Sequence, residues 1–91
     1  MRYIYDEMKR AANIKKHGYS FEDAPLVIES ATTVTFEDKR FVYGEQRFIT
    51  MGMLRDVVVV IVTAETDDEI RVISMRKAER NEQEIYFANL G

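Results

Sequence analysis

The stretch QRFITMGMLRDVVVVIVTA, residues 46–64, decides the fold of this chain. It contains two runs of strand-forming residues, 46–54 and 57–64, separated by the dipeptide Arg-Asp at 55–56. Two residues are the usual length of a tight β-hairpin connection. The run from 57 to 62 is apolar at every position, which is typical of a strand that is covered on both faces. We therefore predict an antiparallel hairpin whose second strand lies at the centre of a sheet.

Strand-forming segments also lie on both sides of this hairpin in the sequence. Residues 31–36 (ATTVTF) precede it and are followed by a charged loop, 37–45. Residues 70–75 (IRVISM) follow it after the acidic segment 65–69. Together with the hairpin, these segments predict four consecutive strands in a mostly antiparallel sheet. Residues 2–5 (RYIY) predict an additional short strand at the start of the chain.

The first helix is predicted over residues 7–17. Asp6 can accept hydrogen bonds from the first backbone amides, and Gly18 can adopt the left-handed conformation that ends a helix. Apolar residues at helical spacing form a thin stripe that we expect to face the core. The residues of this stripe are Met8, Ala11, Ala12 and Ile14.

Two more helices complete the predicted fold. The second helix should begin at Asp23 rather than at Ser20, since Pro25 then lies harmlessly in the first turn. It should end near Glu29, and the last helix should run from about Lys77 to Asn89. These elements predict an α+β fold with two N-terminal helices, a mostly antiparallel four-stranded sheet and a C-terminal helix. The residues of the last helix expected to face inward are Ala78, Ile85 and Tyr86.

Length and composition describe one small acidic domain over residues 1–91. The chain has 91 residues, and its 13 Lys and Arg against 16 Asp and Glu give a net charge of −3. Any nucleic-acid site would therefore need a local basic patch. The absence of cysteine excludes disulfides, cysteine-ligated zinc and thiol catalysis, and it fits a cytoplasmic protein. No apolar run approaches the ~20 residues of a membrane-spanning helix.

The sequence lacks the usual markers of most enzyme classes. It has one histidine, His17, and no glycine-rich phosphate-binding loop, so it predicts neither a metal site nor a cofactor. It does have a set of cations at or near the ends of the predicted elements, and such a set can bind phosphate groups. These residues are Lys16, His17, Arg47, Arg71 and Arg76.

His17 and Arg71 also have structural interpretations. His17 can exchange protons near neutral pH, but it can equally cap carbonyl groups at the C-terminus of its helix. Arg71 should share a strand face with Ile73 and Met75. An arginine among apolar neighbours needs an anion, which can be an internal acid such as Glu45 or a bound phosphate.

Three other residues can also have either a functional or a purely structural role. Arg76 lies at the start of the last predicted helix, where it can bind an anion or pair with Glu79 or Glu82. Lys16 suits the C-terminal end of its helix as a solvated cation. Tyr86 lies one helical turn after Glu82. The ring of such a tyrosine is usually half-buried in the core.

Two motifs resemble those of a known family. The first is Asp6-x-x-Lys-x-x-x-Asn-x-x-Lys-His-Gly18, and the second is Ile70-Arg-Val-Ile-Ser-x-Arg-x-Ala78. Their order, over nearly the whole chain, resembles the BrnT family of type II toxins. The resemblance implies a small bacterial ribonuclease with a RelE-like fold, which arrests translation when free and is neutralised by a BrnA-type antitoxin. The chain departs from the family pattern at Tyr5, where tryptophan is common, and at Glu65, near which an arginine is often found.

The hypothesis of a ribonuclease gives each of these residues a role. Cleavage of RNA without a metal ion needs proton transfer and cations that stabilise charge on the scissile phosphate. We assign His17 as the proton carrier, and Arg47 and Arg76 as phosphate-stabilising residues. The predicted catalytic residues are thus His17, Arg47, Arg76 and, as a helper, Tyr86, and the predicted RNA-binding residues are Lys16 and Arg71.

Two other functions fit the same sequence. The chain can be a non-catalytic module that holds an antitoxin or another partner, and Glu65 favours this alternative. It can also be a small domain that binds RNA or DNA without cleavage, although the net charge of −3 argues against sequence-independent binding. For the ribonuclease we expect RNA and a BrnA-type antitoxin as partners, the latter in a hetero-oligomer.

Overall fold

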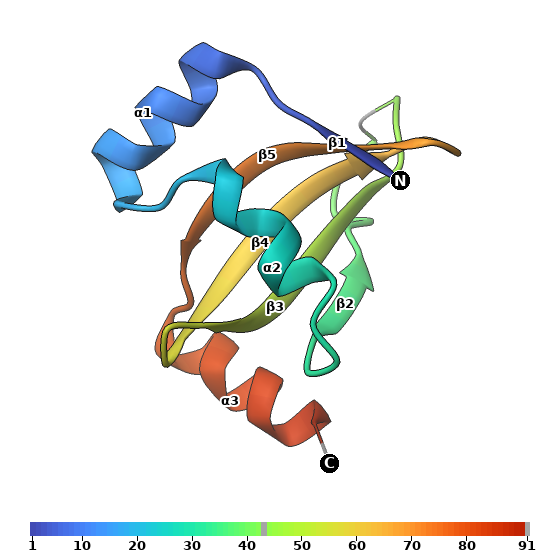
Figure 1. The fold of residues 1–91 in the computed structure, drawn as a ribbon. Coiled ribbons are helices and arrows are strands. Elements are labelled where there is room, and N and C mark those ends of the chain that lie inside the picture. The colour runs from blue at the N-terminus through green and yellow to red at the C-terminus, as the bar shows by residue number, and fades with distance from the viewer. Residues whose placement is uncertain (43, 91) are drawn as a thin grey trace.

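A computed structural model describes residues 1–42 and 44–90 of the chain (Figure 1). Three α-helices and a single sheet confirm the predicted α+β class. Within the described residues, no helix is long and apolar enough to cross a membrane. The elements are β1 (Arg2–Ile4), α1 (Glu7–His17), the 3₁₀ turn η1 (Phe21–Asp23), α2 (Ala24–Ile28), β2 (Val34–Glu37), β3 (Arg47–Leu54), β4 (Val57–Glu65), β5 (Glu69–Lys77) and α3 (Arg80–Asn89).

The sheet has five strands in the order β1-β5-β4-β3-β2. Strands β2 to β5 form the predicted antiparallel meander. Arg55 and Asp56 connect β3 to β4 with φ angles of 48° and 68°, as a two-residue type I′ hairpin requires. The prediction of a four-stranded sheet is wrong, because β1 pairs in parallel with the first residues of β5. The acidic connection is also shorter than predicted, since β4 continues through Glu65 and β5 begins at Glu69.

The central strand, β4, sends alternate side chains into two hydrophobic cores. Val59 and Ile61 pack in the core formed with η1 and α2, on what we call the α2 face of the sheet. Val58 and Val60 pack in the core formed with Tyr86 of α3, on the opposite α3 face. The uninterrupted apolar run of β4 thus has the predicted cause, because both of its faces are covered.

Helix α1 has the predicted boundaries but a different inward face. Asp6 accepts hydrogen bonds from two amides of the first turn at 2.9 and 3.1 Å, and Gly18 follows the helix with a φ angle of 80°. The prediction that the apolar stripe faces the core is wrong, because Met8 is 83% and Ile14 39% exposed. The buried residue of this helix is Asn13.

Asn13 joins α1 to the edge of β5. Its Nδ2 donates to the carbonyl oxygens of Met75 at 2.8 Å and of Tyr19 at 2.9 Å, and its Oδ1 accepts from the backbone N–H of Met75 at 3.2 Å. Strand β1 pairs with residues 69–71 of β5 and ends before this position. The amide of Asn13 therefore satisfies backbone groups that a neighbouring strand would otherwise bond. Hydrogen bonds from one buried side chain, and not the apolar stripe, position α1.

Helix α2 follows Asp23, as predicted, and Pro25 lies in its first turn. Ser20 is used as well, because its side chain accepts a hydrogen bond from the backbone N–H of Glu22 at 3.3 Å and caps η1. Ser20 and Asp23, the two possible N-caps in the sequence, therefore each precede a helical segment.

Helix α3 begins at Arg80, later than predicted, because β5 continues through Lys77. Ala78 and Tyr86 are buried, as predicted. Ile85 is 43% exposed, so the prediction that it faces inward is wrong. Neighbouring residues of an α-helix point about 100° apart, and with Tyr86 directed at the sheet the preceding side chain turns toward solvent.

Candidate functional site

A β-bulge in β5 decides which of its residues share a face. Val62 of β4 pairs with Ser74, but the next residue, Thr63, pairs with Val72. Ile73 is therefore an extra residue in β5. From this point on, the alternation of side chains between the two faces is shifted by one residue.

The shift places Arg71 and Arg76 on the same face although four residues, an even number, separate them. Arg71 pairs with Ala64, and Arg76 pairs with Val60. Both partners belong to the set of β4 residues that point to the α3 face. The prediction that Arg71 shares a face with Met75 is wrong, since Met75 is buried in the core of the α2 face.

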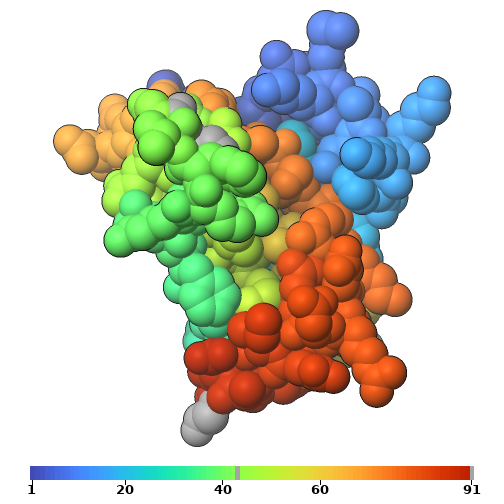
Figure 2. Space-filling model, turned by 180° about the vertical axis from the view of Figure 1, so that it is seen from behind, coloured from blue at the N-terminus to red at the C-terminus, as the bar shows by residue number. Residues whose placement is uncertain are grey.

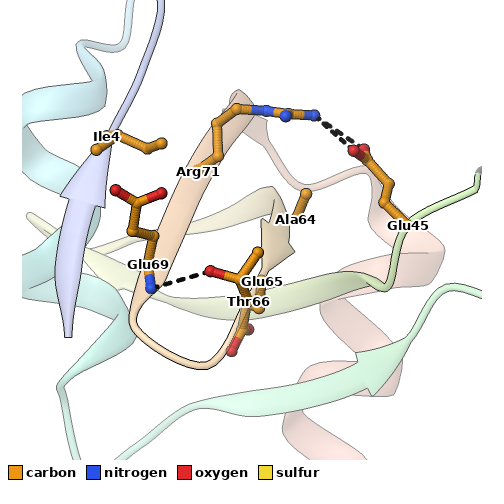
Figure 3. Close-up of a pocket in the computed structure, with 7 residues that line it drawn as sticks. All are labelled: Ile4, Glu45, Ala64, Glu65, Thr66, Glu69 and Arg71. Atoms are coloured by element: carbon orange, nitrogen blue, oxygen red, sulfur yellow. Dashed lines mark hydrogen bonds and ion pairs between the residues drawn. The ribbon is translucent and has the colours of Figure 1, made fainter.

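Arg47 and Arg71 lie in one row across the sheet. Arg47 pairs with Ala64, which in turn pairs with Arg71, so the three side chains share the α3 face. Glu45 binds both arginines. Its Oε2 accepts from Nε of Arg47 at 2.8 Å, and its two oxygens lie 3.0 and 2.9 Å from a terminal nitrogen of Arg71 (Figure 3). These bonds, above all the one from Arg47, lower the pKa of the Glu45 carboxyl below its ordinary value.

A small cavity of about 80 Å³ lies beside Arg71, near the connection between β4 and β5 (Figure 3). Glu45, Glu65 and Glu69 are part of its lining. Glu69 also forms an ion pair with Arg2. Several carboxylates around one guanidinium disfavour an anion inside the cavity. The cavity therefore carries no net positive charge that would attract a free anion.

Arg76 lies on the α3 face but is held by Glu82. Its two terminal nitrogens donate to the two carboxylate oxygens at 2.7 and 2.9 Å. This pairing raises the pKa of Arg76 and lowers the pKa of Glu82. Glu82 also accepts from the backbone N–H of Glu79 at 2.8 Å, which completes the capping box of α3. The pair with Glu82, which is one of the two structural alternatives, is thus present and ties the end of β5 to α3.

Arg40 is a cation that the sequence analysis missed. It lies between β2 and β3, and its guanidinium donates to both oxygens of Asp38 at 2.9 Å. Its charge also acts on Arg76 and Glu82, so the loop carries it toward the start of α3. The sequence signal, a basic pair with Lys39 in a charged loop, is weak because most such residues are solvated surface charges.

His17 and Lys16 lie at the edge of β5. They line a shallow groove between α1 and β5 together with Lys9 and the bulge residues Ile73 and Ser74. In the described part of the chain, no group of three or more histidine, cysteine, aspartate or glutamate side chains could hold a metal ion. The structure thus separates the predicted residues into two groups, with Arg47, Arg71 and Arg76 on the α3 face and Lys16 and His17 in the groove.

Tyr86 belongs to neither group. It is 0% exposed, and its hydroxyl donates to the carbonyl oxygen of Thr32 at 2.6 Å. Its ring meets Phe87 edge to face with 5.1 Å between the centroids. A buried tyrosine needs such a partner for its hydroxyl. These contacts favour the interpretation of Tyr86 as a core residue.

The α3 face is hollowed above the part of the sheet that α3 leaves open. In Figure 2 the loop before β3 (green), β5 (orange) and α3 (red) surround a depression in which the yellow-green atoms of the inner strands are visible. Phe36, which is 40% exposed, pairs with Ile49 on this face. The α3 face thus combines arginine side chains with an exposed aromatic ring, which suits a ligand that carries both phosphates and flat apolar groups.

Comparison with known proteins assigns the chain to a family. Residues 5–82 match the family described as "Ribonuclease toxin, BrnT, of type II toxin-antitoxin system". Among curated proteins, none matches the sequence. The matched region includes the arginine row, the pair of Arg76 and Glu82, and the groove of His17, and it ends before Tyr86. The chain belongs to the BrnT family of ribonuclease toxins of type II toxin-antitoxin systems.

Proposed function

We propose that this chain is a metal-independent ribonuclease of the bacterial cytoplasm, which arrests translation and is neutralised by a BrnA-type antitoxin. The observation that supports this function is the pair Arg47 and Arg71 on the α3 face, where both bind one carboxylate. Two guanidinium groups that hold a carboxylate can hold a phosphodiester in the same way. Membership of a ribonuclease family supports RNA as the molecule that carries this phosphodiester.

The proposed reaction is attack of the ribose 2′-hydroxyl on the adjacent phosphorus. Strand β5 borders both groups, because Ser74 lines the groove of His17 while Arg71 lies on the α3 face, and we place the scissile phosphate across this strand. His17 accepts the hydroxyl proton from the groove side, and Arg47 and Arg71 stabilise the charge on the phosphate oxygens from the α3 face. Arg76 adds positive charge further along the same face, and Lys16 binds the RNA backbone beside His17. The bond from phosphorus to the 5′-oxygen breaks, this oxygen takes a proton from water, and His17 returns its proton to the solvent, so that no net proton is gained or lost. The products then end in a 2′,3′-cyclic phosphate and a 5′-hydroxyl.

The first test is cleavage of labelled RNA by the purified chain in excess EDTA. We expect His17→Ala to lower the rate at least about tenfold, which corresponds to ~1.4 kcal/mol of transition-state stabilisation. Lys15→Ala removes an exposed cation from the same turn of α1 and serves as the control. Its rate should stay within about twofold of the wild type. A wild-type rate for folded His17→Ala, or cleavage that needs added metal, would contradict the proposal.

A second variant tests the role of Tyr86. We expect Tyr86→Phe to keep the rate of RNA cleavage and to lower the free energy of unfolding by about 1 kcal/mol, because the Thr32 carbonyl loses its hydrogen bond. Urea unfolding measures the stability, and the EDTA assay measures the rate. A large loss of rate in a variant of normal stability would instead assign a catalytic role to the Tyr86 hydroxyl.

The proposal of an antitoxin partner rests on family and charge. The chain has a net charge of −3, while Arg47, Arg71 and Arg76 lie together on the hollowed α3 face. An acidic segment of a partner would be steered to this hollow and repelled from the rest of the surface. A stable interface buries about 1,600 Å² in total, which is enough to cover such a hollow. Membership of a type II toxin family supports an antitoxin as the partner.

A non-catalytic module that holds the antitoxin is the second candidate function. Glu65 favours it, because this carboxylate lines the cavity beside Arg71. The EDTA assay distinguishes the two functions. Binding of the antitoxin without any cleavage of RNA would favour the module.

A further inference from the structure

We propose that Glu45 is an internal competitor of the substrate: its carboxylate occupies the position of an RNA phosphodiester between Arg47 and Arg71 and is displaced when RNA binds. This inference rests on the proposed function, because it takes these two arginines as the phosphate-binding groups. It goes beyond that function by assigning to Glu45 a role opposite to that of a binding residue. Glu45 lowers the affinity of the free toxin for RNA.

The contacts of Glu45 are those that a phosphodiester would make. Its carboxylate lies 2.8 Å from Nε of Arg47 and 2.9 Å from a terminal nitrogen of Arg71. A phosphodiester also offers two charged oxygens on one atom, and the same guanidinium donors can bind them. The two arginines are therefore already oriented toward a common anion before any ligand arrives.

The position of Glu45 allows exchange with a ligand. The side chains of Arg47, Glu45 and Arg71 are 27%, 29% and 45% exposed. Ion pairs at this exposure are screened by solvent and contribute little to stability. Glu45 lies two residues before Arg47, the first residue of β3, so its side chain can swing away while the strand pairing of Arg47 with Ala64 remains.

The second arginine-glutamate pair on this face is built differently. Glu82 binds Arg76, but it also accepts the backbone N–H of Glu79 and closes the capping box of α3. Displacing Glu82 would leave the first turn of α3 without this cap. A phosphate is therefore expected to exchange with Glu45 and not with Glu82. This contrast identifies Arg47 and Arg71 as the exchangeable site.

The experiment measures binding of a fluorescent 2′-O-methyl RNA oligonucleotide, which cannot be cleaved by its own 2′-oxygen. Glu45→Gln removes the charge but keeps the size of the side chain, and we expect it to bind the oligonucleotide about tenfold more tightly than the wild type. Glu22→Gln is the control, because it removes the same charge from an exposed side chain of η1, which packs on the opposite face of the sheet. We expect its affinity to change by less than about twofold.

Each other outcome would overturn the inference. Weaker binding by Glu45→Gln would make Glu45 a residue that positions the arginines, and an equal gain in both variants would reflect net charge alone. Unchanged affinity, or no binding by any of the proteins, would show that Glu45 does not compete with RNA.

A measurement on the wild-type chain covers the case in which Glu45→Gln does not fold. Binding of the oligonucleotide should move the Nε–H signal of Arg47 in a ¹⁵N spectrum and return the carboxyl ¹³C signal of Glu45 to that of a solvated carboxylate. A Glu45 signal that stays unchanged at saturation would overturn the inference. The EDTA assay stays separate: wild-type cleavage with unchanged Glu45→Gln affinity defeats only this inference, and tighter binding without cleavage defeats only the ribonuclease.

Discussion

Replacing Asn13 by alanine is expected to lower the free energy of unfolding by about 3 kcal/mol. The change removes two hydrogen bonds to Met75 and one to the carbonyl of Tyr19. Asn13 is 7% exposed, so the freed backbone groups regain little contact with water. A buried polar group without a partner costs more than an average hydrogen bond contributes.

Urea unfolding with a matched control checks this expectation. Asn89→Ala makes the same substitution at an exposed position, where Nδ2 donates to the carbonyl of Ile85, and it should change stability by less than about 0.5 kcal/mol. Asn13→Asp is a second probe, since a carboxylate can accept from the Met75 N–H but cannot donate to either carbonyl. A stability of Asn13→Ala close to that of the wild type would show that α1 is held by other contacts.

The double variant Arg47→Ala/Arg71→Ala is expected to cleave RNA about 100-fold more slowly than the wild type, a loss of ~2.7 kcal/mol in transition-state stabilisation. The proposed site loses both groups that bind the scissile phosphate, and Glu45 is left with an unpaired charge that repels RNA. Single variants retain one guanidinium, so each should lose less.

A control for net charge is Arg55→Ala/Arg80→Ala, whose side chains are 71% and 95% exposed. Rates are compared in EDTA at equal salt, and melting temperatures show that each variant is folded. We expect the control to stay within about threefold of the wild type. Equal losses in both double variants would indicate a general effect of charge, and no loss in either would place the phosphate elsewhere.

The central sheet could be predicted because local chemistry and tertiary packing agree there. The two-residue connection at 55–56 and the apolar run at 57–62 each have one simple structural explanation, and the structure has both. The boundaries of α1 were equally predictable from Asp6 and Gly18, whose backbone roles depend on neighbours in sequence. Local signals of this kind are sufficient when tertiary contacts do not oppose them.

The inward face of α1 could not be predicted from hydrophobicity. Met8 and Ile14 suggest an apolar stripe, but Asn13 is the residue that packs, because its amide matches the backbone of β5 at Met75. This match depends on two segments that are far apart in sequence. A polar residue on the buried side of a helix is therefore hard to recognise before the fold is known.

The bulge in β5 had a sequence signal, although a weak one. Val72 and Ile73 are adjacent apolar residues in an otherwise alternating strand, and such a pair can mark a shift of register. Regular alternation without this shift separates Arg71 from Val72, as observed, but puts it on one face with Met75, which is wrong. The partners of Arg71 and Arg76 could not be predicted for a different reason. A glutamate and a phosphate satisfy an arginine equally well, and the sequence does not distinguish them.

The use of a side-chain amide at the margin of the sheet has a consequence for aggregation. An uncovered strand edge can template pairing with a second chain. Here β1 has three residues and β2 has four, both shorter than the usual ~5–6. Beyond the end of β1, the Asn13 amide forms hydrogen bonds with the carbonyl and the N–H of Met75. The fold thus limits edge-to-edge polymerisation by short edge strands and by one side-chain amide that covers backbone groups of β5.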